Sequence, residues 1–399
     1  MDITITPTKL CGSIRAIASK SQAHRLLICA AFSDKKTVLF CPETNRDIEA
    51  TADCLRSLGA TIHRAANEYI VHPISHISNK ATLRCGESGS TLRFMLPIVG
   101  ALGVDATFVL EGRLPYRPLS PLWEEMERHG CTLTRPTETT VRCTGQLQSG
   151  NYSIDGNVSS QFITGLMFSM ALIPGDNTLT VTGSIESKPY VGMTRKALKQ
   201  FGVNTDNLTP DATFPFTSPG KISVEGDWSN GAFFLAAKAL GSNVDVTNLD
   251  ADSPQGDRAV THILKQLEQP DSLIDAADVP DLVPILAVSA GAMHGGTFTN
   301  IRRLRLKESD RVATVCEMLR NLGAKAESTE NTLRVYPAAY HGCTIDSAGD
   351  HRIAMAAAIA ATVASGAITV TDAQCVCKSY PSFWAEYRRL GGQYEQQLR

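Results

Sequence analysis

Residues 319–327 have the sequence LRNLGAKAE, in which two leucines precede a glycine and a short, mostly polar stretch. A glycine directly after the last apolar position of a helical pattern is typical of a helix C-cap. The residues after this glycine favour a short strand. The stretch therefore predicts a helix that ends near Leu322, a cap at Gly323 and a strand over residues 324–327.

The same pattern recurs along the chain. Four further copies end at Gly59, Gly130, Gly202 and Gly391, and a degenerate copy ends at Glu268. Strands are expected after three of these glycines, over residues 60–63, 131–134 and 203–205. Successive copies are roughly 55 to 72 residues apart, which is too long for a solenoid repeat. Six α/β units of this size predict two domains, each built of three repeated units.

The domain boundaries follow from the same units. The third unit ends near Pro219, and residues 222–232 then predict a strand, a turn and the start of an alanine-rich helix. Apolar and polar residues alternate at the N-terminus, which predicts a strand. This strand could belong to either half, and we place it with the C-terminal half. We therefore expect one domain over residues 1–12 and 227–399, and a second domain over residues 13–226.

Composition sets the class of protein. The chain has 399 residues, of which 43% are hydrophobic and 20% charged, as expected for a globular protein with two to three domains. Its net charge of −2 argues against non-specific nucleic-acid binding, because no basic stripe is available to follow phosphates.

Targeting signals and metal-binding patterns are not found. The N-terminus has neither a basic nor an apolar segment of a secretory signal. Residues 353–370 are rich in alanine and broken by Ser365 and Gly366, which predicts a core helix followed by a strand rather than a membrane span. The 11 cysteines include no CxxC pair. We therefore expect reduced thiols, no structural metal, no membrane segment and a cytoplasmic location.

A local excess of basic residues indicates an anion site. Five basic side chains lie within residues 302–311, in a chain with 38 basic and 40 acidic residues. Apolar residues follow at helical spacing, so we expect Lys307, Glu308 and Arg311 around the first turn of a helix. Free backbone N–H groups and the macrodipole favour anions there. For this run alone, a solvated charged face is an equally good interpretation.

Four other expected helices begin with similar chemistry. Residues 19–25, 87–93, 156–161 and 349–352 combine hydroxyl groups, glycine or cations directly before apolar helical residues. One such start is usually a plain N-cap, but the repetition favours a set of anion-binding helix starts. Residues 86–91 lack the Gly-Lys-Ser/Thr ending of a P-loop, so ATP is not expected.

Nine motifs follow one another along the chain. They are SKSQAHR at 19–25, ESGSTLR at 87–93, YRP at 116–118, SSQ at 159–161, SKPY at 187–190, VPD at 279–281, LKESDR at 306–311, DHR at 350–352 and CKSYP at 377–381. In this order they resemble the 5-enolpyruvylshikimate-3-phosphate synthase family over essentially the whole chain. The resemblance implies an inside-out α/β barrel fold with two domains of three repeated α/β units each, and an active site in the interdomain cleft.

The resemblance also implies a reaction. An enzyme of this family transfers the enolpyruvyl group of phosphoenolpyruvate to the 5-hydroxyl of shikimate 3-phosphate and releases phosphate, on the route to chorismate and the aromatic amino acids. The reaction passes through a tetrahedral intermediate and needs no cofactor or metal. The expected partners are the two small-molecule substrates, with no nucleic acid and no membrane, and the expected state is a monomer.

Substrate contacts are implied residue by residue. Shikimate 3-phosphate is expected to contact Lys20, Ser21, Arg25, Ser159, Ser160, Gln161, Ser187, Tyr190, Asp281 and Lys307. Phosphoenolpyruvate is expected to contact Lys20, Gly89, Arg117, Gln161, Arg311, Arg352 and Lys378. Guanidinium groups suit this ligand because they donate two parallel hydrogen bonds to a carboxylate or a phosphate.

Addition followed by elimination requires two groups that handle protons. We expect Asp281 to be the base for the 5-hydroxyl and Glu308 to be the acid for the methylene carbon. Cations beside Glu308 would lower its pKa, whereas a desolvated site would raise it. His351 and Lys378 remain alternative proton carriers, and Lys20 is placed with the catalytic group.

Some positions depart from the commonest family pattern. Ala18 and Phe94 stand where prolines are common, Glu87 and Ser88 replace the usual Asn-Ala, and Arg303 stands where some members have an asparagine that contacts shikimate. These differences leave the implied reaction unchanged. They concern sensitivity to inhibitors and the shikimate contact at residue 303.

Two alternative functions are considered. The sister enzyme that transfers enolpyruvate to UDP-N-acetylglucosamine uses a loop cysteine, but this chain has no cysteine between Cys85 and Cys131, and its residues 159–161 suit a small phosphorylated ring. A non-catalytic binding protein of the same fold is the other alternative, and it would need neither Asp281 nor Glu308.

Overall fold

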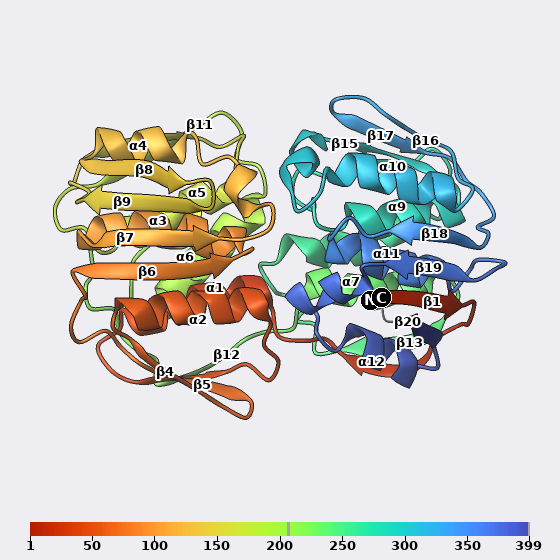
Figure 1. Cartoon of the computed structure of the whole chain (residues 1–399), viewed down its shortest axis with the longest axis horizontal. Coiled ribbons are helices and arrows are strands. Elements are labelled where there is room, and N and C mark those ends of the chain that lie inside the picture. Colours follow the sequence, from red (N-terminus) through yellow and green to blue (C-terminus); the bar gives the residue numbers. More distant parts are fainter. Residues whose placement is uncertain (206–207, 398–399) are drawn as a thin grey trace. The chain divides into compact units, whose positions relative to one another are not determined.

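The computed structural model describes residues 1–205 and 208–397. The chain divides into two compact units (Figure 1). Unit 1 comprises Met1–Ile17 and Gly226–Arg399, and unit 2 comprises Ala18–Glu225. Each unit has a hydrophobic core of its own.

Unit 2 alternates short strands and helices. Its strands are β3 (Thr37–Phe40), β4 (Thr61–Ala65), β5 (Glu68–His72), β6 (Lys80–Gly86), β7 (Asp105–Leu110), β8 (Cys131–Thr137), β9 (Thr140–Gly145), β10 (Asn151–Asp155), β11 (Thr178–Thr182) and β12 (Lys221–Ser223). Its helices are α1 (Lys20–Ala31), α2 (Arg46–Leu58), α3 (Gly89–Leu102), η1 (Leu114–Tyr116), α4 (Leu122–Arg128), α5 (Ser160–Met170) and α6 (Lys188–Gln200).

Unit 1 contains the N-terminal strands and the C-terminal half. Its strands are β1 (Asp2–Thr6), β2 (Cys11–Arg15), β13 (Asn243–Thr247), β14 (Leu273–Asp275), β15 (Gly296–Thr299), β16 (Ala326–Ser328), β17 (Thr332–Val335), β18 (Cys343–Asp346), β19 (Ile368–Thr371) and β20 (Gln393–Gln397). Its helices are α7 (Trp228–Ala239), η2 (Gly256–Ala259), α8 (Val260–Gln266), α9 (Val283–Ala292), η3 (Arg302–Leu306), α10 (Arg311–Asn321), α11 (His351–Ala360), η4 (Ala373–Lys378) and α12 (Phe383–Arg389).

The sequence repeat corresponds to a repeated sheet. Each unit has two four-stranded sheets and one two-stranded parallel pair among its described strands. In the sheets β6-β7-β9-β8 and β14-β15-β17-β16, the successive pairs are parallel, antiparallel and antiparallel. The sheets β12-β3-β5-β4 and β18-β19-β1-β20 have the same pattern. None of the described sheets closes on itself.

The expected glycine caps are confirmed. Gly59, Gly130, Gly202, Gly323 and Gly391 all have φ between +76° and +116°, a region that favours glycine because it has no Cβ. The left-handed residue lets the chain leave each helix and reverse direction. Strands β4, β8 and β16 follow three of these caps as predicted, and β20 follows Gly391, after which no strand was named.

The strand predicted over residues 203–205 is not formed. The amide of Val203 donates to the Leu198 carbonyl at 3.0 Å. The Thr205 carbonyl accepts from Arg195 Nε at 2.8 Å, and the Thr205 hydroxyl donates to the Arg195 carbonyl at 3.3 Å. Since these groups are bonded to α6, the segment folds back on the helix that it follows instead of pairing with a strand.

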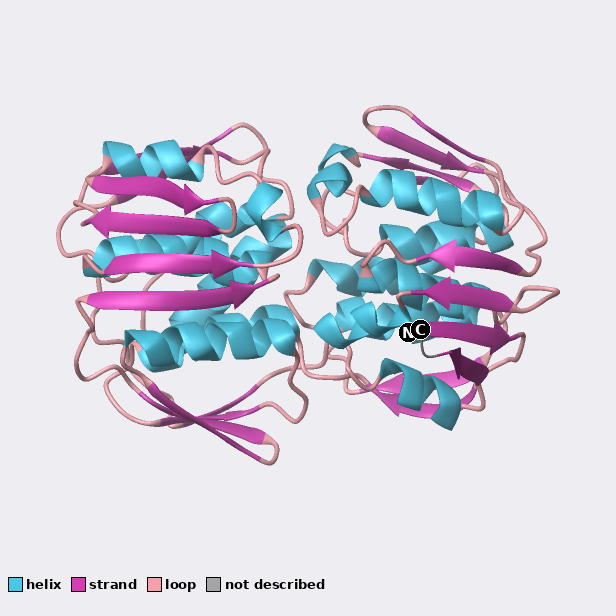
Figure 2. Cartoon of the chain, in the orientation of Figure 1, coloured by secondary structure: helices cyan, strands magenta, loops and turns pink. Residues whose placement is uncertain are grey.

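In each unit, helices pack against the sheets (Figure 2), and some of them, such as α2 and α4, keep one exposed side. In unit 1, helices α7, α9 and α11 contact one another and are buried along almost their whole length. The sequence of α9, VPILAVSAGA, is apolar on every side, which is typical of a helix surrounded by protein. Strands such as β10 alternate exposed and buried residues, as expected for a sheet with one face in solvent. No described helix is long and apolar enough to span a membrane.

Four of the predicted helix starts are confirmed. Ser19, Ser88, Ser159 and Asp350 are the N-caps of α1, α3, α5 and α11, and each side chain accepts a hydrogen bond from a backbone N–H of the first turn. Each cap therefore satisfies one of the free amides at its helix start and fixes where the next side chains lie.

The fifth helix start differs from the prediction. Helix α10 begins at Arg311, because the Asp310 side chain accepts from the Ala313 amide and makes Asp310 the N-cap. Arg311 is in the first turn as expected. Lys307 and Glu308 instead lie between η3 and the cap, outside the helix.

Candidate active site

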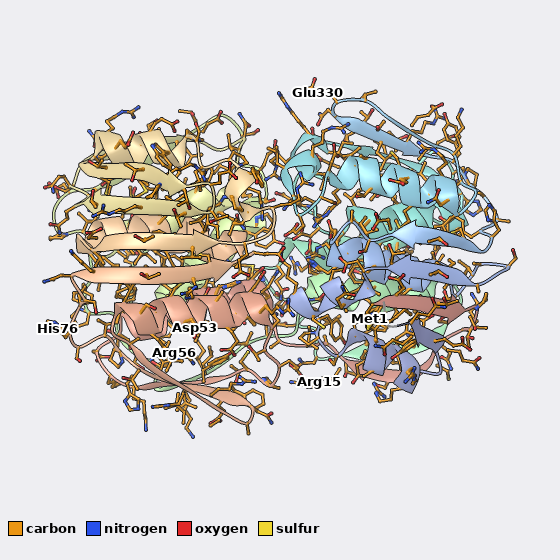
Figure 3. The ribbon with its side chains drawn as sticks, in the orientation of Figure 1. Met1, Arg15, Asp53, Arg56, His76 and Glu330 are labelled. Atoms are coloured by element: carbon orange, nitrogen blue, oxygen red, sulfur yellow. The ribbon has the colours of Figure 1, made fainter. Side chains whose placement is uncertain are left out.

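Most charged side chains lie on the surface, where their ion pairs contribute little. On α2, Arg56 Nη1 and Asp53 Oδ1 are 2.5 Å apart, but the two side chains are 32% and 60% exposed (Figure 3). Exposed pairs of this kind stabilise a protein by about 0–1 kcal/mol. Several charged residues of the nine motifs form a different kind of network, whose centre is buried.

Arg311 is the centre of this network in unit 1. Its side chain is 1% exposed and contacts three carboxylates. Its Nε lies 2.9 Å from Asp350 Oδ2, its Nη1 lies 2.8 Å from Asp281 Oδ1, and its Nη2 lies 2.7 Å from Glu308 Oε2. Burial alone would lower the pKa of Arg311, but Asp350, Glu308 and Asp281 together raise it above its ordinary value. The guanidinium is therefore a fixed positive charge, and it contacts both predicted proton carriers, Asp281 and Glu308.

Asp281 contacts two further cations. Its carboxylate lies 3.5 Å from Lys307 Nζ and 3.3 Å from Arg352 Nη2. Burial would raise the pKa of Asp281, but Arg352, Lys307 and Arg311 hold it well below its ordinary value. Asp281 is therefore ionised at neutral pH, as a general base must be.

Arg352 spans several elements of unit 1. Its Nη1 donates to the Asp281 carbonyl at 3.1 Å, and its Nη2 donates to Ser229 Oγ at 2.9 Å. Arg352 is in the first turn of α11, Ser229 is in the first turn of α7, and Asp281 directly precedes the N-cap of α9. The starts of three core helices thus meet at one guanidinium.

Two other predicted residues lie on neighbouring segments. His351 is the buried first residue of α11, directly before Arg352. Lys378 is buried at the end of η4. The next residue, Ser379, accepts a hydrogen bond from Asn230 Nδ2 of α7 at 3.3 Å. The first turn of α7 therefore supports the segment that carries Lys378.

Arg303 is also in this part of unit 1. Its Nη2 donates to the Ala277 carbonyl at 3.0 Å. Burial lowers the pKa of Arg303 to about 10, so it keeps its charge at neutral pH. The structure therefore places a cation at the position where some members of the resembled family have a neutral asparagine.

In unit 2, Gln161 connects two helix starts. Its Nε2 donates to Ser90 Oγ at 2.9 Å, and its Oε1 accepts from Arg93 Nη1 at 2.7 Å. Arg93 Nη2 also donates to the Pro118 carbonyl at 2.9 Å. Arg93 thereby holds the segment that carries Arg117. It was not among the predicted site residues, although it ends the motif at 87–93.

Gly89 leaves room for Arg117. A Cβ built on Gly89 would lie 2.6 Å from Arg117 Nη1 and 3.1 Å from Arg93 Nη1, closer than carbon and nitrogen atoms normally approach. Any side chain at residue 89 would therefore displace the Arg117 guanidinium. This contact gives a physical reason for glycine at the first position of α3.

Lys20 is close to the same helix starts. Its Nζ lies 2.8 Å from Asp47 Oδ2, and the Asp47 carbonyl accepts from the Thr91 hydroxyl at 3.4 Å. These bonds link the first turns of α1, α2 and α3. Together with Gln161 of α5, four helix starts of unit 2 are connected, each with free N–H groups that favour an anion.

Arg25 organises a second group in unit 2. It is buried, and its Nη1 donates to the Ser21 carbonyl at 2.6 Å. Its Nε donates to Thr194 Oγ1 at 2.9 Å, and its Nη2 donates to the Tyr190 carbonyl at 3.0 Å. Burial lowers the pKa of Arg25 to about 10. The guanidinium therefore fixes Ser21 of α1 against Tyr190 of α6.

Ser159, Ser160 and Ser187, which the resemblance implies as contacts of the shikimate phosphate, all lie at helix starts. Ser159 is the N-cap of α5 and Ser160 is its first residue. Ser187 directly precedes α6 and has φ +53°. A left-handed conformation costs a non-glycine residue on the order of 1–3 kcal/mol, and such strain is often found at functional sites.

The structure brings most of the predicted residues together within each unit. Unit 1 gathers Lys307, Glu308 and Arg311 around Asp281 and Arg352. Unit 2 forms one group around Gln161, Gly89 and Lys20, and another around Arg25. Sequence reasoning missed Asp350 and Asp47 as partners of these cations. Asp350 lies at an expected helix start, whereas no helix start was predicted near Asp47.

This arrangement supports a specific chemistry. Both units place cations and free helix amides where polyanions could bind. Unit 1 adds two carboxylates that contact the same guanidinium, which provides groups for proton transfer beside an anion.

Comparisons with known proteins identify the family. The family model for EPSP synthase (3-phosphoshikimate 1-carboxyvinyltransferase) matches residues 5–387. The chain is 36% identical to the 3-phosphoshikimate 1-carboxyvinyltransferase of Clostridium kluyveri, over 99% of this chain and 98% of the relative. It is 37% identical to the enzyme of the same name from Clostridium novyi, over 98% of each chain.

Solved structures agree on the fold. An EPSP synthase from Acinetobacter baumannii has a TM-score of 0.77 at 22% identity, over 99% of this chain and 100% of the other. The enolpyruvyl transferase NikO from Streptomyces tendae has a TM-score of 0.78 at 17% identity, over 100% of this chain and 99% of the other. The predicted fold class is thus confirmed, and the names of the curated relatives do not favour the UDP-sugar alternative. The chain belongs to the EPSP synthase family.

Proposed function

We propose that this chain transfers the enolpyruvyl group of phosphoenolpyruvate to the 5-hydroxyl of shikimate 3-phosphate and releases phosphate. The family match supports the reaction. The observation that carries the site assignment is the contact of both Asp281 and Glu308 with the buried guanidinium of Arg311. Two carboxylates on one fixed cation can carry two protons close to an anionic substrate.

Each substrate is assigned its own set of contacts, and Lys20 and Gln161 belong to both sets. Phosphoenolpyruvate contacts Lys20, Gly89, Arg117, Gln161, Arg311, Arg352 and Lys378 in this proposal. Shikimate 3-phosphate contacts Lys20, Ser21, Arg25, Ser159, Ser160, Gln161, Ser187, Tyr190, Asp281 and Lys307. Arg25 has its Nε, Nη1 and Nη2 atoms bonded within unit 2, so we assign it mainly to holding Ser21 and Tyr190 in place.

Substrate binding activates Asp281 as a base. In the free chain, Arg352, Lys307 and Arg311 hold the pKa of Asp281 low, which makes it a weak proton acceptor. Anionic substrates that contact Arg352 and Lys307 offset these positive charges, so the pKa of Asp281 rises when they bind. Asp281 then accepts the proton of the 5-hydroxyl as the oxygen attacks C2 of phosphoenolpyruvate.

In the substrate complex of this proposal Glu308 carries a proton, which it delivers to the methylene carbon in the same step. It lies on the other side of Arg311 from Asp281, bonded to Nη2 instead of Nη1. The tetrahedral adduct then returns this proton to Glu308 as the C–O bond to phosphate breaks, and Asp281 gives the hydroxyl proton to the leaving phosphate, so both carboxyl groups regain their starting states. His351, Lys378 and Lys20 are the alternative carriers, to which the role passes if Glu308 is dispensable.

Release of inorganic phosphate tests the reaction. Purified protein is mixed with phosphoenolpyruvate and either shikimate 3-phosphate or unphosphorylated shikimate, and free phosphate is measured with time. We expect rapid release only with shikimate 3-phosphate. No release above background with either acceptor would contradict the proposal and favour a non-catalytic binding protein.

Gly89→Ala tests the phosphoenolpyruvate assignment. The new methyl group would lie 2.6 Å from Arg117 Nη1 and displace it. We expect the KM for phosphoenolpyruvate to rise about tenfold or more while the KM for shikimate 3-phosphate changes little. Glyphosate, an anion of similar size that should compete with phosphoenolpyruvate, should bind more weakly as well. Steady-state kinetics with each ligand varied in turn would show this, and equal effects on both substrates would contradict it.

Lys307 gives shikimate 3-phosphate binding a pH dependence. Burial lowers the pKa of Lys307 to about 8, although Asp281 raises it. The ammonium group is therefore charged at pH 7 and loses its proton as the pH rises through 8. We expect the Kd for shikimate 3-phosphate to rise up to about tenfold between pH 7 and pH 9. Calorimetric titration at several pH values would measure this.

Two controls isolate the Lys307 effect. Lys307→Arg keeps its charge across this range, so its Kd should be nearly constant with pH. We assign the phosphate of shikimate 3-phosphate to Lys307. Unphosphorylated shikimate lacks this phosphate, so its Kd should not follow the same curve. An identical pH profile for Lys307→Arg and the parent chain would assign the titration to another group.

A further inference from the structure

Asp257 lies behind Arg352 and outside the residues assigned to the substrates. It is in η2 and is 3% exposed. Its Oδ2 accepts a hydrogen bond from Ser229 Oγ at 2.5 Å, and the same Ser229 Oγ accepts from Arg352 Nη2 at 2.9 Å. Arg352, Ser229 and Asp257 thus form one chain of hydrogen bonds that runs from α11 through α7 to η2.

The direction of this chain is fixed by chemistry. A guanidinium can only donate, so Ser229 must accept from Arg352. With Asp257 ionised, the hydroxyl proton of Ser229 goes to Asp257 Oδ2, which acts as the acceptor. A charged donor and a carboxylate acceptor at the two ends strengthen both bonds.

The surroundings of Asp257 support a specific role. The charged groups that face it are Asp281, Arg352 and Asp227, of which only Arg352 is a cation. Burial and the nearby Asp281 carboxylate raise the pKa of Asp257 to about 7, and Arg352 opposes part of this rise. Its Oδ1 is buried and has no hydrogen-bond partner among the described residues. A carboxyl group is costly to bury in this way, and its one polar connection leads to Arg352.

The opposite side of Arg352 is held by Asp281. Nη1 donates to the Asp281 carbonyl, and Nη2 lies 3.3 Å from Asp281 Oδ2. Nη2 is therefore placed between Asp281 and Ser229. The bond to Ser229 counteracts the attraction of the Asp281 carboxylate, so its loss should let the guanidinium move towards Asp281.

We propose that Asp257 is a positioning residue which, through Ser229, holds the Arg352 guanidinium in the orientation that binds phosphoenolpyruvate. The inference rests on the proposed role of Arg352. Asp257 contacts neither substrate in the proposed function, and the inference assigns it a role. Ser229 connects Asp257 to Arg352.

The expected kinetics separate positioning from general support. Asp257→Ala and Ser229→Ala should each raise the KM for phosphoenolpyruvate about tenfold, the size of effect expected for losing a hydrogen bond to a charged group. The values of kcat and of the KM for shikimate 3-phosphate should stay within about threefold of the parent chain. Asp257→Asn keeps an acceptor oxygen for Ser229, so it should restore the KM for phosphoenolpyruvate to within about threefold.

A double-mutant cycle tests whether Asp257 acts through Arg352. Arg352→Ala removes the group that is positioned, so adding Asp257→Ala to it should have almost no further effect on phosphoenolpyruvate. A purely structural role would instead give additive losses. Ser289→Ala is the matched control, because Ser289 is also a buried serine of unit 1 but its hydroxyl donates to Ile285 of its own helix. It should leave both KM values unchanged.

The outcomes are distinguishable. Unchanged phosphoenolpyruvate KM in Arg352→Ala would overturn the assignment of Arg352 in the proposed function. A large effect of Arg352→Ala beside no effect of Asp257→Ala and Ser229→Ala would overturn the positioning role alone. Thermal unfolding would show whether Asp257→Ala folds. If it does not fold, the kinetics of Ser229→Ala and Asp257→Asn still test the positioning role of Asp257. Additive losses in the Ser229→Ala, Arg352→Ala pair would overturn the proposal.

Discussion

Asp281→Asn and Glu308→Gln should each lower kcat by about 100-fold or more, with much smaller changes in both KM values. Each amide has nearly the shape of the carboxylate and can still accept a hydrogen bond from Arg311. It cannot, however, accept or deliver the proton that the proposed steps need. Measurement of kcat by phosphate release at saturating substrates would give the size of each effect.

Asp310→Asn is the matched control for these variants. Asp310 lies in the same segment, but it is exposed and its side chain caps α10 by accepting from the Ala313 amide. Asparagine is an equally good N-cap, so turnover should stay normal. If Glu308→Gln also kept near-normal turnover, its role would pass to His351, Lys378 or Lys20. The same result in Asp281→Asn would remove Asp281 as the base.

Arg311→Ala should have the largest effect on stability. It leaves the carboxylates of Asp350, Asp281 and Glu308 without the buried cation that all three contact. Removing one partner of a buried ion pair typically costs about 3–5 kcal/mol, because the remaining charges are desolvated and uncompensated. We expect the free energy of unfolding, from urea denaturation, to fall by about this amount.

Arg56→Ala provides the comparison on the surface. Arg56 has an equally short contact with Asp53, but both side chains are exposed to solvent. Its loss should change the free energy of unfolding by less than about 1 kcal/mol. Similar losses in the two variants would mean that burial does not decide the strength of these pairs and that the Arg311 network is not a structural centre.

Much of the fold could be predicted because its signals are local. The glycine after each helix requires a positive φ, and the residues on either side have helical or extended patterns. Gly323 and the strand after it show how a few residues define one repeat. The segment after Gly202 shows the limit of this reasoning. Its strand pattern is overridden by bonds to Arg195, which lies eight residues before the segment begins.

The site was predictable where its residues lie at helix starts. Serine and aspartate are preferred N-cap residues, so residue type alone predicts the caps at Ser19, Ser88, Ser159 and Asp350. By contrast, Asp257 follows a short QG sequence with no helical pattern, and only the folded chain places it beside Ser229. The domain limits at residues 12 and 226 and the active site in an interdomain cleft stay predictions.

The three carboxylates on Arg311 also bear on selectivity among the many anions of a cell. Chloride or a bicarbonate ion offers a single negative charge, and to reach this guanidinium it would have to compete with Asp350, Asp281 and Glu308. Such an ion could not replace the bonds that it broke. Only a ligand that presents several charged oxygens to several of the neighbouring cations at once can rearrange the network. The three carboxylates therefore keep common monovalent anions from binding Arg311. Turnover should depend little on which monovalent salt is present.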